Sequence, residues 1–264
     1  MLSFRLGKKI KLQIFSNLNT VMTIILFDVD GTLTPSGGVI KIDMIETLEK
    51  LSNRNDIDLG VVGGGSYDKI KWQLGDIISK FKYIFAECGS VTYVNGKLIA
   101  EKNMLDHCNR NVLNLIIKKA LNEISNMPII YNGHQIEFRK GLIYISPPGM
   151  QASNYERDIF MKMDKELGLR KSLMAKLSEL NNNSQFEITL GGAVGIGICP
   201  IGWNKSQVIN YFKTNLISDD IYYFGDKTEP DGNDYPIYSH PLVHGVSVID
   251  YTDTINYLIK LFIE

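Results

Sequence analysis

The sequence has few cysteines. There are three in 264 residues, Cys88, Cys108 and Cys199, and no two of them stand in the CxxC spacing that is typical of zinc and redox sites. An odd number of scattered cysteines also argues against a disulfide framework, which small secreted proteins need and proteins of a reducing compartment do not. We therefore expect a cytoplasmic protein without disulfide bonds.

Long hydrophobic runs are missing as well. A membrane-spanning helix requires roughly 20 consecutive apolar residues, whereas the best run, residues 21–27, is far shorter and contains Thr23. We therefore expect a soluble protein with no membrane partner.

An excess of charge of either sign is also absent. Lysine and arginine together number 28 against 29 acidic residues, so the net charge is −1. Without a general basic field, nucleic-acid binding is excluded as the main role. Arginine, the side chain that binds phosphate bidentately, is scarce. The six arginines are Arg5, Arg54, Arg110, Arg139, Arg157 and Arg170.

Residues 1–21 differ from the rest of the chain. They carry basic but no acidic side chains, a composition typical of a transit peptide. Alternatively, translation begins at Met22, directly before the first strong strand. Under either interpretation this segment is an N-terminal extension outside the fold.

Two stretches of the chain alternate short apolar runs with apolar residues at helical spacing. The runs end abruptly in Asp or Gly, which is typical of buried parallel strands. This alternation predicts a doubly wound α/β sheet, which binds its ligands beyond the carboxyl ends of the strands. The expected strands are residues 23–27, 57–62, 83–86, 221–224 and 246–249. The expected helices are one with Ile42, Ile45 and Leu48, one with Ile70, Leu74 and Ile77, residues 204–214, and one with Ile255, Leu258 and Phe262.

The middle of the chain follows another pattern. Asn95-Gly96 predicts a hairpin between residues 91–94 and 97–100, because a type I′ turn needs positive φ at both central positions. Beyond it, expected helices and strands are mixed. The expected helices are residues 108–125, 155–167 and 171–180, and the expected strands are 135–139, 142–146, 186–190 and 194–199. The sequence therefore predicts an α/β core, residues 22–100 and 201–264, interrupted by an inserted α+β domain, residues 101–200.

The sharpest local signal is the pair Asp28 and Asp30 in the segment DVDGT, directly after the first expected strand. Two carboxylates at a strand tip can share a divalent cation, and one of them can also move a proton. With the charge of a phosphoryl group neutralised, a carboxylate can attack phosphorus and form an aspartyl-phosphate. Asp and Gly are also common in simple turns, but the buried strand before them favours the catalytic interpretation.

A second acidic loop, GDKTEPDGND at residues 225–234, directly follows another expected strand. Since all strand ends of a parallel sheet open on one side, Asp226 and Asp234 can meet Asp28 around one cation. The sequence therefore predicts a divalent-metal site that involves Asp28, Asp30, Asp226 and Asp234.

These segments resemble the haloacid dehalogenase superfamily of Mg²⁺-dependent phosphotransferases and, more closely, the eukaryotic-type phosphomannomutase family. The matching blocks run in order from about residue 22 to 264: LFDVDGTLTP, GVVGG, KIKWQLGD, IFAECGS, IEFRKGLIYISPPG, GWNK and YFGDKTEPDGNDYPIY. The resemblance implies that the inserted domain is a cap, with a sugar phosphate bound between cap and core. It also implies Mg²⁺ as cofactor, a hexose 1,6-bisphosphate as activator and a homodimer formed through the caps.

The resemblance assigns roles to the core residues. Asp28 matches the nucleophile, which is also a metal ligand. Asp30 matches the general acid/base, whose main-chain oxygen also meets the metal. Asp226 matches a metal ligand, Asp234 a supporting carboxylate, and Lys205 in GWNK the lysine that neutralises the phosphate.

The resemblance also assigns substrate-binding residues. Arg139 and Arg157 match arginines of the cap that hold the distal phosphate and the sugar. The family has a phosphate-binding serine where this chain has Gly65, and a local shift by one residue would bring the Ser66 hydroxyl into its place.

The chain departs from the family at the substrate site. Arginines are expected at the position of Ser36 and Gly37 and at that of Met150, and a Ser-x-Asp pair at Gly195 and Gly197. We therefore predict that the chemistry of the core is retained, while the affinity for sugar phosphates or the choice among them has changed.

Three functions remain open at this point. The first is a phosphomannomutase that interconverts mannose 6-phosphate and mannose 1-phosphate through an aspartyl-phosphate and so feeds GDP-mannose synthesis. The second is a sugar-phosphate phosphatase in which a weakened cap admits water. The third is a non-catalytic homologue that only binds sugar phosphates. Removal of Asp28 would abolish the first two functions and spare the third.

Overall fold

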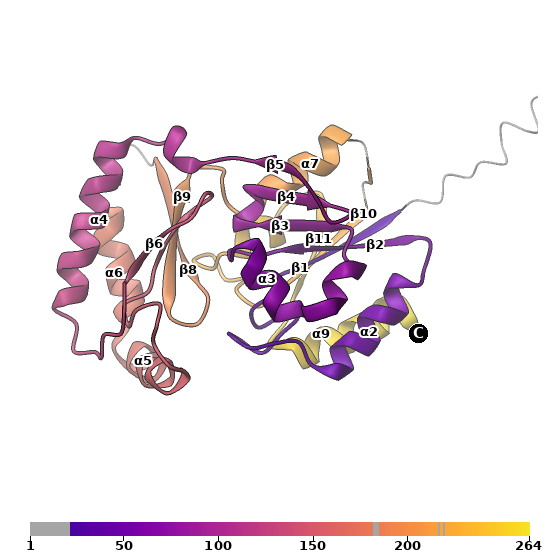
Figure 1. The fold of residues 1–264 in the computed structure, drawn as a ribbon, viewed down its shortest axis with the longest axis horizontal. Coiled ribbons are helices and arrows are strands. Elements are labelled where there is room, and N and C mark those ends of the chain that lie inside the picture. The colour runs from indigo at the N-terminus through magenta and orange to yellow at the C-terminus, as the bar shows by residue number, and fades with distance from the viewer. Residues whose placement is uncertain (1–21, 182–184, 216, 219) are drawn as a thin grey trace, which may run out of the picture.

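The computed structural model describes residues 22–181, 185–215, 217–218 and 220–264, and it contains two β-sheets (Figure 1). The sequence interpretation of residues 1–21 lies outside the described residues. In spatial order, the larger sheet consists of β11 (Val243–Ser247), β10 (Asp220–Gly225), β1 (Thr23–Phe27), β2 (Ile57–Val62), β3 (Tyr83–Ala86), β4 (Val91–Val94) and β5 (Lys97–Glu101). The smaller sheet consists of β6 (Ile136–Phe138), β7 (Ile143–Ile145), β9 (Gly195–Pro200) and β8 (Phe186–Gly191).

The strands from β11 to β3 pair in parallel, and β4 and β5 extend the sheet as an antiparallel hairpin. At the hairpin turn, Asn95 has a φ of 49° and Gly96 a φ of 72°. Positive φ at both positions is what a type I′ turn requires, so the predicted hairpin is confirmed.

Helices cover both faces of the larger sheet because side chains alternate along each strand. In β1, Ile25 and Phe27 belong to one hydrophobic cluster, and Ile24 and Leu26 to another. The first cluster packs against α2 (Ile42–Ser52), α3 (Tyr67–Leu74), the 3₁₀ helix η1 (Gly75–Lys80) and α9 (Tyr251–Leu258). The second cluster packs against α7 (Gln207–Asn215) and α8 (Tyr235–Tyr238). This is the doubly wound arrangement that the sequence predicts.

The smaller sheet is antiparallel and has helices on one face. Its buried isoleucines, such as Ile143, Ile145, Ile196 and Ile198, form one cluster with side chains of two helices. These helices are α4 (Arg110–Ser125) and α6 (Leu169–Ser178), and α5 (Asn154–Leu167) precedes α6. Tyr144 stands between Ile143 and Ile145 in β7, so its side chain lies on the opposite face of this sheet. That face is directed towards the larger sheet.

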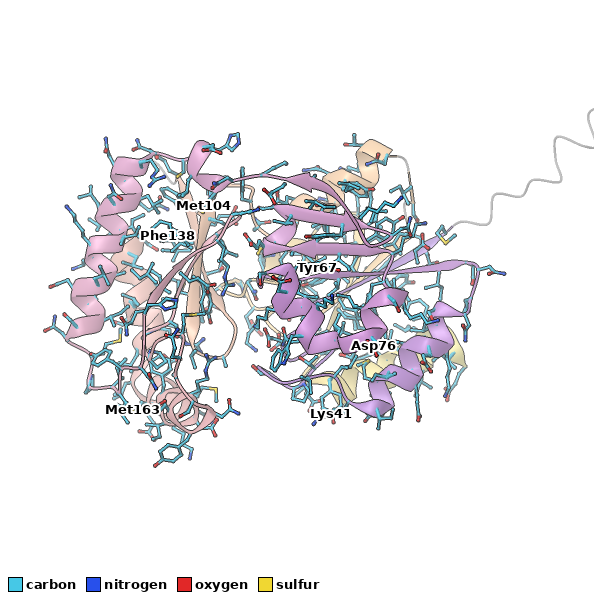
Figure 2. The ribbon with its side chains drawn as sticks, in the orientation of Figure 1. Lys41, Tyr67, Asp76, Met104, Phe138 and Met163 are labelled. Atoms are coloured by element: carbon cyan, nitrogen blue, oxygen red, sulfur yellow. The ribbon has the colours of Figure 1, made fainter. Side chains whose placement is uncertain are left out.

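Side chains fill both parts of the molecule (Figure 2). The labelled residues Lys41, Tyr67 and Asp76 lie on the part with the larger sheet, and Met104, Phe138 and Met163 on the part with the smaller one. The smaller sheet and its helices lie in the sequence between β5 and α7. The fold class is therefore confirmed as an α/β core with an inserted α+β cap, and we use the names core and cap for these parts.

Several predicted elements have different bounds in the structure, and two of these differences have a clear physical cause. The helix expected to carry Ile70, Leu74 and Ile77 ends at Leu74, because Gly75 has a φ of 57° and the chain continues as η1. The strand expected at residues 246–249 begins earlier, as β11, because its parallel register with β10 places Val243 opposite Ile221.

No helix in the described ranges combines the length and the apolar character that a membrane span requires.

Candidate active site

The DVDGT loop continues directly from β1. The Asp28 amide donates a hydrogen bond to the carbonyl of Phe224 at 2.9 Å, so Asp28 lies beside the end of β10. The chain then turns sharply, and the amides of Leu33 and Thr34 both donate to the Val29 carbonyl at 3.0 Å. The turn leaves the carboxyl group of Asp28 at the carboxyl end of the parallel strands, where α/β proteins bind their ligands.

Gly31 allows this loop to approach the second acidic loop. Its φ is +88°, and a Cβ atom at this position would lie 2.6 Å from Oδ2 of Asp226. Both the backbone conformation and the space therefore require glycine.

Three carboxylates converge where the two loops meet. Asp28, Asp226 and Asp234 each offer an oxygen, and these oxygens lie within 4.8 Å of one another. Oδ1 of Asp226 is buried and has no hydrogen-bond partner among the described residues. Buried polar atoms are almost always paired, and carboxylate oxygens are the preferred ligands of Mg²⁺. These residues therefore fit a divalent cation. The Asp30 carboxylate is not part of this cluster, and the role of its main-chain oxygen as a metal ligand stays a prediction.

Lys205 lies against two of these carboxylates and is fully buried. Its Nζ donates to Oδ1 of Asp28, to Oδ1 of Asp234 at 2.6 Å and to the Tyr223 hydroxyl at 3.3 Å. The Tyr223 hydroxyl in turn donates to Asp234 at 2.5 Å. The structure thus brings together the predicted nucleophile, the predicted phosphate lysine and the supporting carboxylate.

The three carboxylates carry more negative charge than Lys205 and Lys227, which pairs with Oδ2 of Asp226, balance together. Burial raises the pKa of Asp28 to about 7; Lys205 opposes this shift, and the charges of Asp234 and Asp226 add to it. The pKa of Asp234 is lowered, because the charge of Lys205 and the hydrogen bonds from Lys205 and Tyr223 outweigh its burial. A divalent cation at the three carboxylates would supply the missing positive charge.

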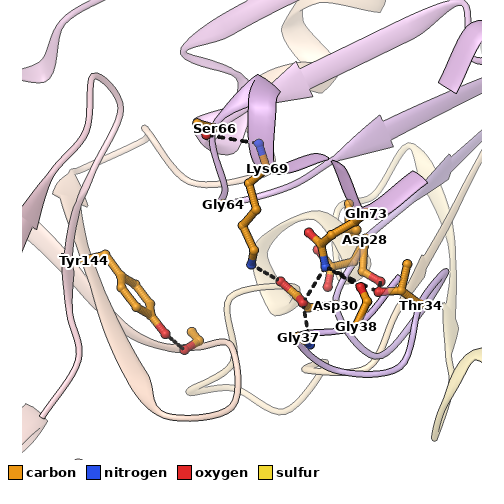
Figure 3. A network of polar contacts seen from close by, with 12 residues as sticks. Asp28, Asp30, Thr34, Gly37, Gly38, Gly64, Ser66, Lys69, Gln73 and Tyr144 are labelled. Carbon is orange, nitrogen blue, oxygen red and sulfur yellow. Dashed lines mark hydrogen bonds and ion pairs between the residues drawn. The ribbon is translucent and has the colours of Figure 1, made fainter. Parts of the chain in front are cut away.

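Asp30 has a separate set of partners (Figure 3). Its carboxylate accepts hydrogen bonds from Lys69 Nζ at 2.6 Å, Gln73 Nε2 at 2.8 Å and the Gly37 amide at 2.8 Å. Burial opposes ionisation, but the charge of Lys69 and these hydrogen bonds outweigh it and lower the pKa of Asp30. Asp30 is therefore held in the ionised form.

The predicted phosphate-binding Ser66 is the N-cap of α3, and its Oγ accepts a hydrogen bond from the Lys69 amide at 3.3 Å. In the described part of the chain, Gly64 and Gly65 line the cleft between core and cap, and Ser66 does not. Its role in phosphate binding stays a prediction.

The two predicted arginines of the cap both line the cleft. Arg139 reaches across to the core, where its Nη1 donates to the Gly64 carbonyl at 2.8 Å, and its Nη2 pairs with Glu137 at 2.7 Å. Arg157 donates from Nε to the Ala152 carbonyl at 2.9 Å. The structure brings both arginines to the same cleft as Asp28.

The cleft has a volume of about 1100 Å³, part of which is open solvent. Its core side includes Asp28, Asp226, Lys205 and Lys69, and its cap side includes Arg139, Tyr144, Met150 and Arg157. A cleft lined by cations and carboxylates on one side and by apolar and basic groups on the other suits a small phosphorylated ligand.

A sequence profile described as eukaryotic phosphomannomutase matches residues 44–264. Phosphomannomutase 1 of Dictyostelium discoideum is 38% identical over 243 residues, which cover 91% of this chain and 96% of that protein. Human phosphomannomutase 1 is 34% identical over 241 residues, which cover 90% of this chain and 91% of that protein. The chain belongs to the eukaryotic phosphomannomutase family. The family predicted from the sequence is thereby confirmed, and these names agree with the first of the three functions considered.

Solved structures of low sequence identity share the fold. The IMP-nucleotidase of Plasmodium falciparum, in its N-terminally truncated IMP-bound form, superposes with a TM-score of 0.64 at 14% identity, covering 92% of this chain and 70% of that one. The sucrose-phosphatase of Synechocystis sp. PCC6803 gives a TM-score of 0.57 at 15% identity, covering 92% of this chain and 89% of that one. At such identities the likeness extends to the fold alone.

Three of the positions that depart from the phosphomannomutase pattern lie within the cleft. Ser36, Met150 and Gly197, which stand where the family pattern has polar or charged side chains, all line it. The altered positions are therefore placed to contact a ligand, as the prediction of a changed affinity requires.

Sequence reasoning missed the residues that hold this phosphomannomutase-like site together. Lys69 and Gln73 are four residues apart on α3 and so share one face of the helix, a signal that could have linked them to Asp30. Tyr223 is one of several apolar or aromatic residues of β10, and the sequence offers no signal that its hydroxyl meets Lys205 and Asp234.

Proposed function

We propose that this protein is a Mg²⁺-dependent phosphomannomutase that interconverts mannose 6-phosphate and mannose 1-phosphate. The observation that carries the proposal is the buried cluster of Asp28, Lys205, Asp226 and Asp234 at the floor of a cleft that is roofed by the cap. Membership of the phosphomannomutase family supports the same reaction and the same substrates.

Asp28, Asp226 and Asp234 would hold Mg²⁺, with the main-chain oxygen of Asp30 as a further ligand. Bound there, the ion would neutralise the charge of the transferring phosphoryl group. Lys205 supports the same task from within the protein, because its ammonium group already lies against Asp28.

The first half-reaction loads the enzyme. A carboxylate oxygen of Asp28 attacks one phosphorus atom of a hexose 1,6-bisphosphate, the bond from phosphorus to the sugar oxygen breaks, and an aspartyl-phosphate forms. The sugar oxygen leaves with the electron pair and takes a proton from Asp30. Since Lys69 holds Asp30 ionised, Asp30 must be released from Lys69 and take up a proton before it can act as an acid.

The second half-reaction returns the phosphoryl group. A hexose monophosphate binds with its phosphate towards the cap and its free hydroxyl towards Asp28, and Asp30 removes the proton from that hydroxyl. That oxygen attacks the phosphorus on Asp28, which regenerates the carboxylate and a bisphosphate. The bisphosphate then turns round, so that its other phosphoryl group is transferred to Asp28 and the isomeric monophosphate leaves. The ionised form of Asp30 in the structure is the form that the proton removal needs.

The cap protects the intermediate from water and holds the far end of the sugar. Arg139 and Arg157 face the cleft and would bind the distal phosphate through charge-assisted hydrogen bonds. Exclusion of water prevents hydrolysis of the aspartyl-phosphate.

An assay of both products tests the proposal. Purified protein is incubated with Mg²⁺, mannose 1-phosphate and a trace of glucose 1,6-bisphosphate, and both mannose 6-phosphate and free phosphate are followed. We expect mannose 6-phosphate without release of phosphate, and none from Asp28→Asn. Release of free phosphate as fast as mannose 1-phosphate is consumed would instead make the protein a phosphatase. Absence of both products would leave only the binding of sugar phosphates.

Three further expectations belong with this proposal. The protein acts in the cytoplasm, it supplies mannose 1-phosphate for GDP-mannose synthesis, and it forms a homodimer through the caps. Light scattering during size-exclusion chromatography tests the dimer directly.

A further inference from the structure

Tyr144 presents its ring to the cleft. It is the central residue of β7, and its neighbours Ile143 and Ile145 belong to the hydrophobic core of the cap. Since side chains alternate along a strand, the tyrosine ring lies on the opposite face, where it lines the cleft. Figure 3 shows it on the cap side, facing the group around Asp30, with its hydroxyl donating to the Gly191 carbonyl at 3.1 Å.

The ring occupies space that glycine residues leave free. A Cβ atom at Gly195 would lie 2.1 Å from Cζ of Tyr144, and one at Gly192 would lie 3.1 Å from its hydroxyl oxygen. Gly195 does not have the positive φ that would require glycine for conformational reasons. Glycine is therefore needed at position 195 because the tyrosine ring fills the place of any side chain there.

Other side chains hold the ring in place. The guanidinium carbon of Arg139 lies 4.8 Å from the ring centroid, within the range of a cation–π contact. The ring also packs against an apolar cluster of Cys88, Leu142 and Cys199. A ring fixed by a hydrogen bond, a cation and apolar packing forms a rigid wall rather than a mobile side chain.

We propose that Tyr144 is a specificity-determining residue: its ring is the wall on which the pyranose ring of a hexose phosphate packs, and Gly195 is its required partner. The inference rests on the proposed function, which supplies the hexose phosphate. A pyranose has faces made of C–H groups, and their burial against an aromatic ring contributes affinity without a hydrogen bond to any one hydroxyl. The Tyr144 ring therefore selects ligands by the face of the sugar ring that packs against it.

Binding measurements on two ligands test this wall. Mannose 1-phosphate carries the sugar ring, whereas inorganic phosphate has no ring that could pack on Tyr144. By calorimetry with Mg²⁺ present, we expect Tyr144→Ala to weaken mannose 1-phosphate at least tenfold, about 1.4 kcal/mol. Tyr144→Phe, which keeps the ring, should stay within about twofold of the unaltered protein. Inorganic phosphate should bind all three proteins equally.

Each other outcome has a distinct meaning. An affinity of Tyr144→Ala for mannose 1-phosphate within about twofold of the unaltered protein, or an equal loss for both ligands, overturns the inference and leaves the proposed function standing. Binding of phosphate but of no hexose phosphate by the unaltered protein overturns the inference together with the proposed function.

Thermal unfolding tests the partnership with Gly195. We expect Gly195→Ala to lower Tm by about 5 °C or more, and the double variant with Tyr144→Ala to lose less than the sum of the single changes. Gly197→Ala is the matched control, because a Cβ there would lie 3.8 Å from Thr189 Oγ1, an ordinary contact. If Gly195→Ala is as stable as Gly197→Ala, the ring does not require glycine at 195 and the partnership is wrong.

Discussion

Lys205 Nζ donates to Oδ1 of Asp234 at 2.6 Å, and neither side chain has any exposed surface. The same ammonium group meets Asp28, which has only a small exposed fraction. A buried ion pair is weak evidence of net stabilisation, but removal of one partner leaves an uncompensated buried charge. The residues that would bind phosphate in the proposed reaction therefore also affect the free energy of unfolding of the core.

The first prediction concerns this ion pair. Lys205→Met should lower the free energy of unfolding by about 3–5 kcal/mol, because Asp28 and Asp234 lose the cation that compensates them. Urea unfolding followed by circular dichroism measures the loss. Lys119→Met is the matched control, because Lys119 pairs with Glu123 at 2.7 Å on the surface, where such a pair contributes little. An equal loss in both variants would contradict the prediction.

The second prediction concerns the metal. Asp226→Asn should weaken the binding of Mg²⁺ at least about tenfold, since it removes a charged ligand whose buried Oδ1 has no partner among the described residues. Titration calorimetry with Mg²⁺ alone measures this affinity without any need for turnover. Asp231→Asn is the control, because Asp231 lies in the same loop but outside the carboxylate cluster, where it pairs with Lys171 at 3.1 Å. Unchanged affinity in Asp226→Asn would exclude Asp226 as a ligand.

The third prediction concerns Lys69. Lys69→Met should lower kcat about tenfold, because Asp30 loses a partner that orients its carboxylate. Tm should change little, since an ion pair so exposed to solvent stabilises weakly. Lys71→Met, an exposed change on the same helix, should alter neither quantity. A fall in Tm without a change in kcat would show that Lys69 is structural only.

The fourth prediction is a pH dependence at the cleft. Burial raises the pKa of Cys88 to about 11, so at pH values well below this the residue is a neutral thiol, which is a poor nucleophile. Alkylation of Cys88 by iodoacetamide should be slow near about pH 8 and should accelerate roughly tenfold for each unit of rise towards pH 10. Mass spectrometry of the peptide that contains Cys88 measures the rate. A rate already at its plateau at neutral pH would contradict the raised pKa.

Sequence patterns predicted those features of the fold that depend on local spacing. β1 and β2 have the predicted bounds because each is a short apolar run that ends at Asp28 or at Gly63. The hairpin turn at Asn95 also follows from local chemistry, because few residues accept a positive φ. The start of β11 could not be predicted in this way. It is set by pairing with β10, whose parallel register places Val243 opposite Ile221, and not by a local pattern.

The candidate site shows the same division. Asp28, Asp226 and Asp234 could be brought together from the sequence, because parallel strands place their carboxyl ends on one side. The contacts of Tyr144 could not be predicted, because the sequence does not show which side chain fills the space beside the glycines around it. Local motifs thus predict which groups react, whereas the shape of the ligand's surroundings depends on how the cap folds.

The last prediction separates backbone strain from crowding at the metal loop. Gly31→Ala places a methyl group 2.6 Å from Oδ2 of Asp226 at a φ of +88°, whereas Gly168→Ala has a φ of +63° and no atom within 4 Å. Left-handed backbone alone should lower the stability of each variant by about 1–2 kcal/mol. Only Gly31→Ala should also weaken Mg²⁺ binding, because the methyl group displaces the Asp226 carboxylate. Calorimetry beside thermal unfolding distinguishes the two effects. Equal Mg²⁺ affinity in both variants would show that Asp226 yields to the methyl group without leaving the cluster, and that the close approach at Gly31 does not position this ligand.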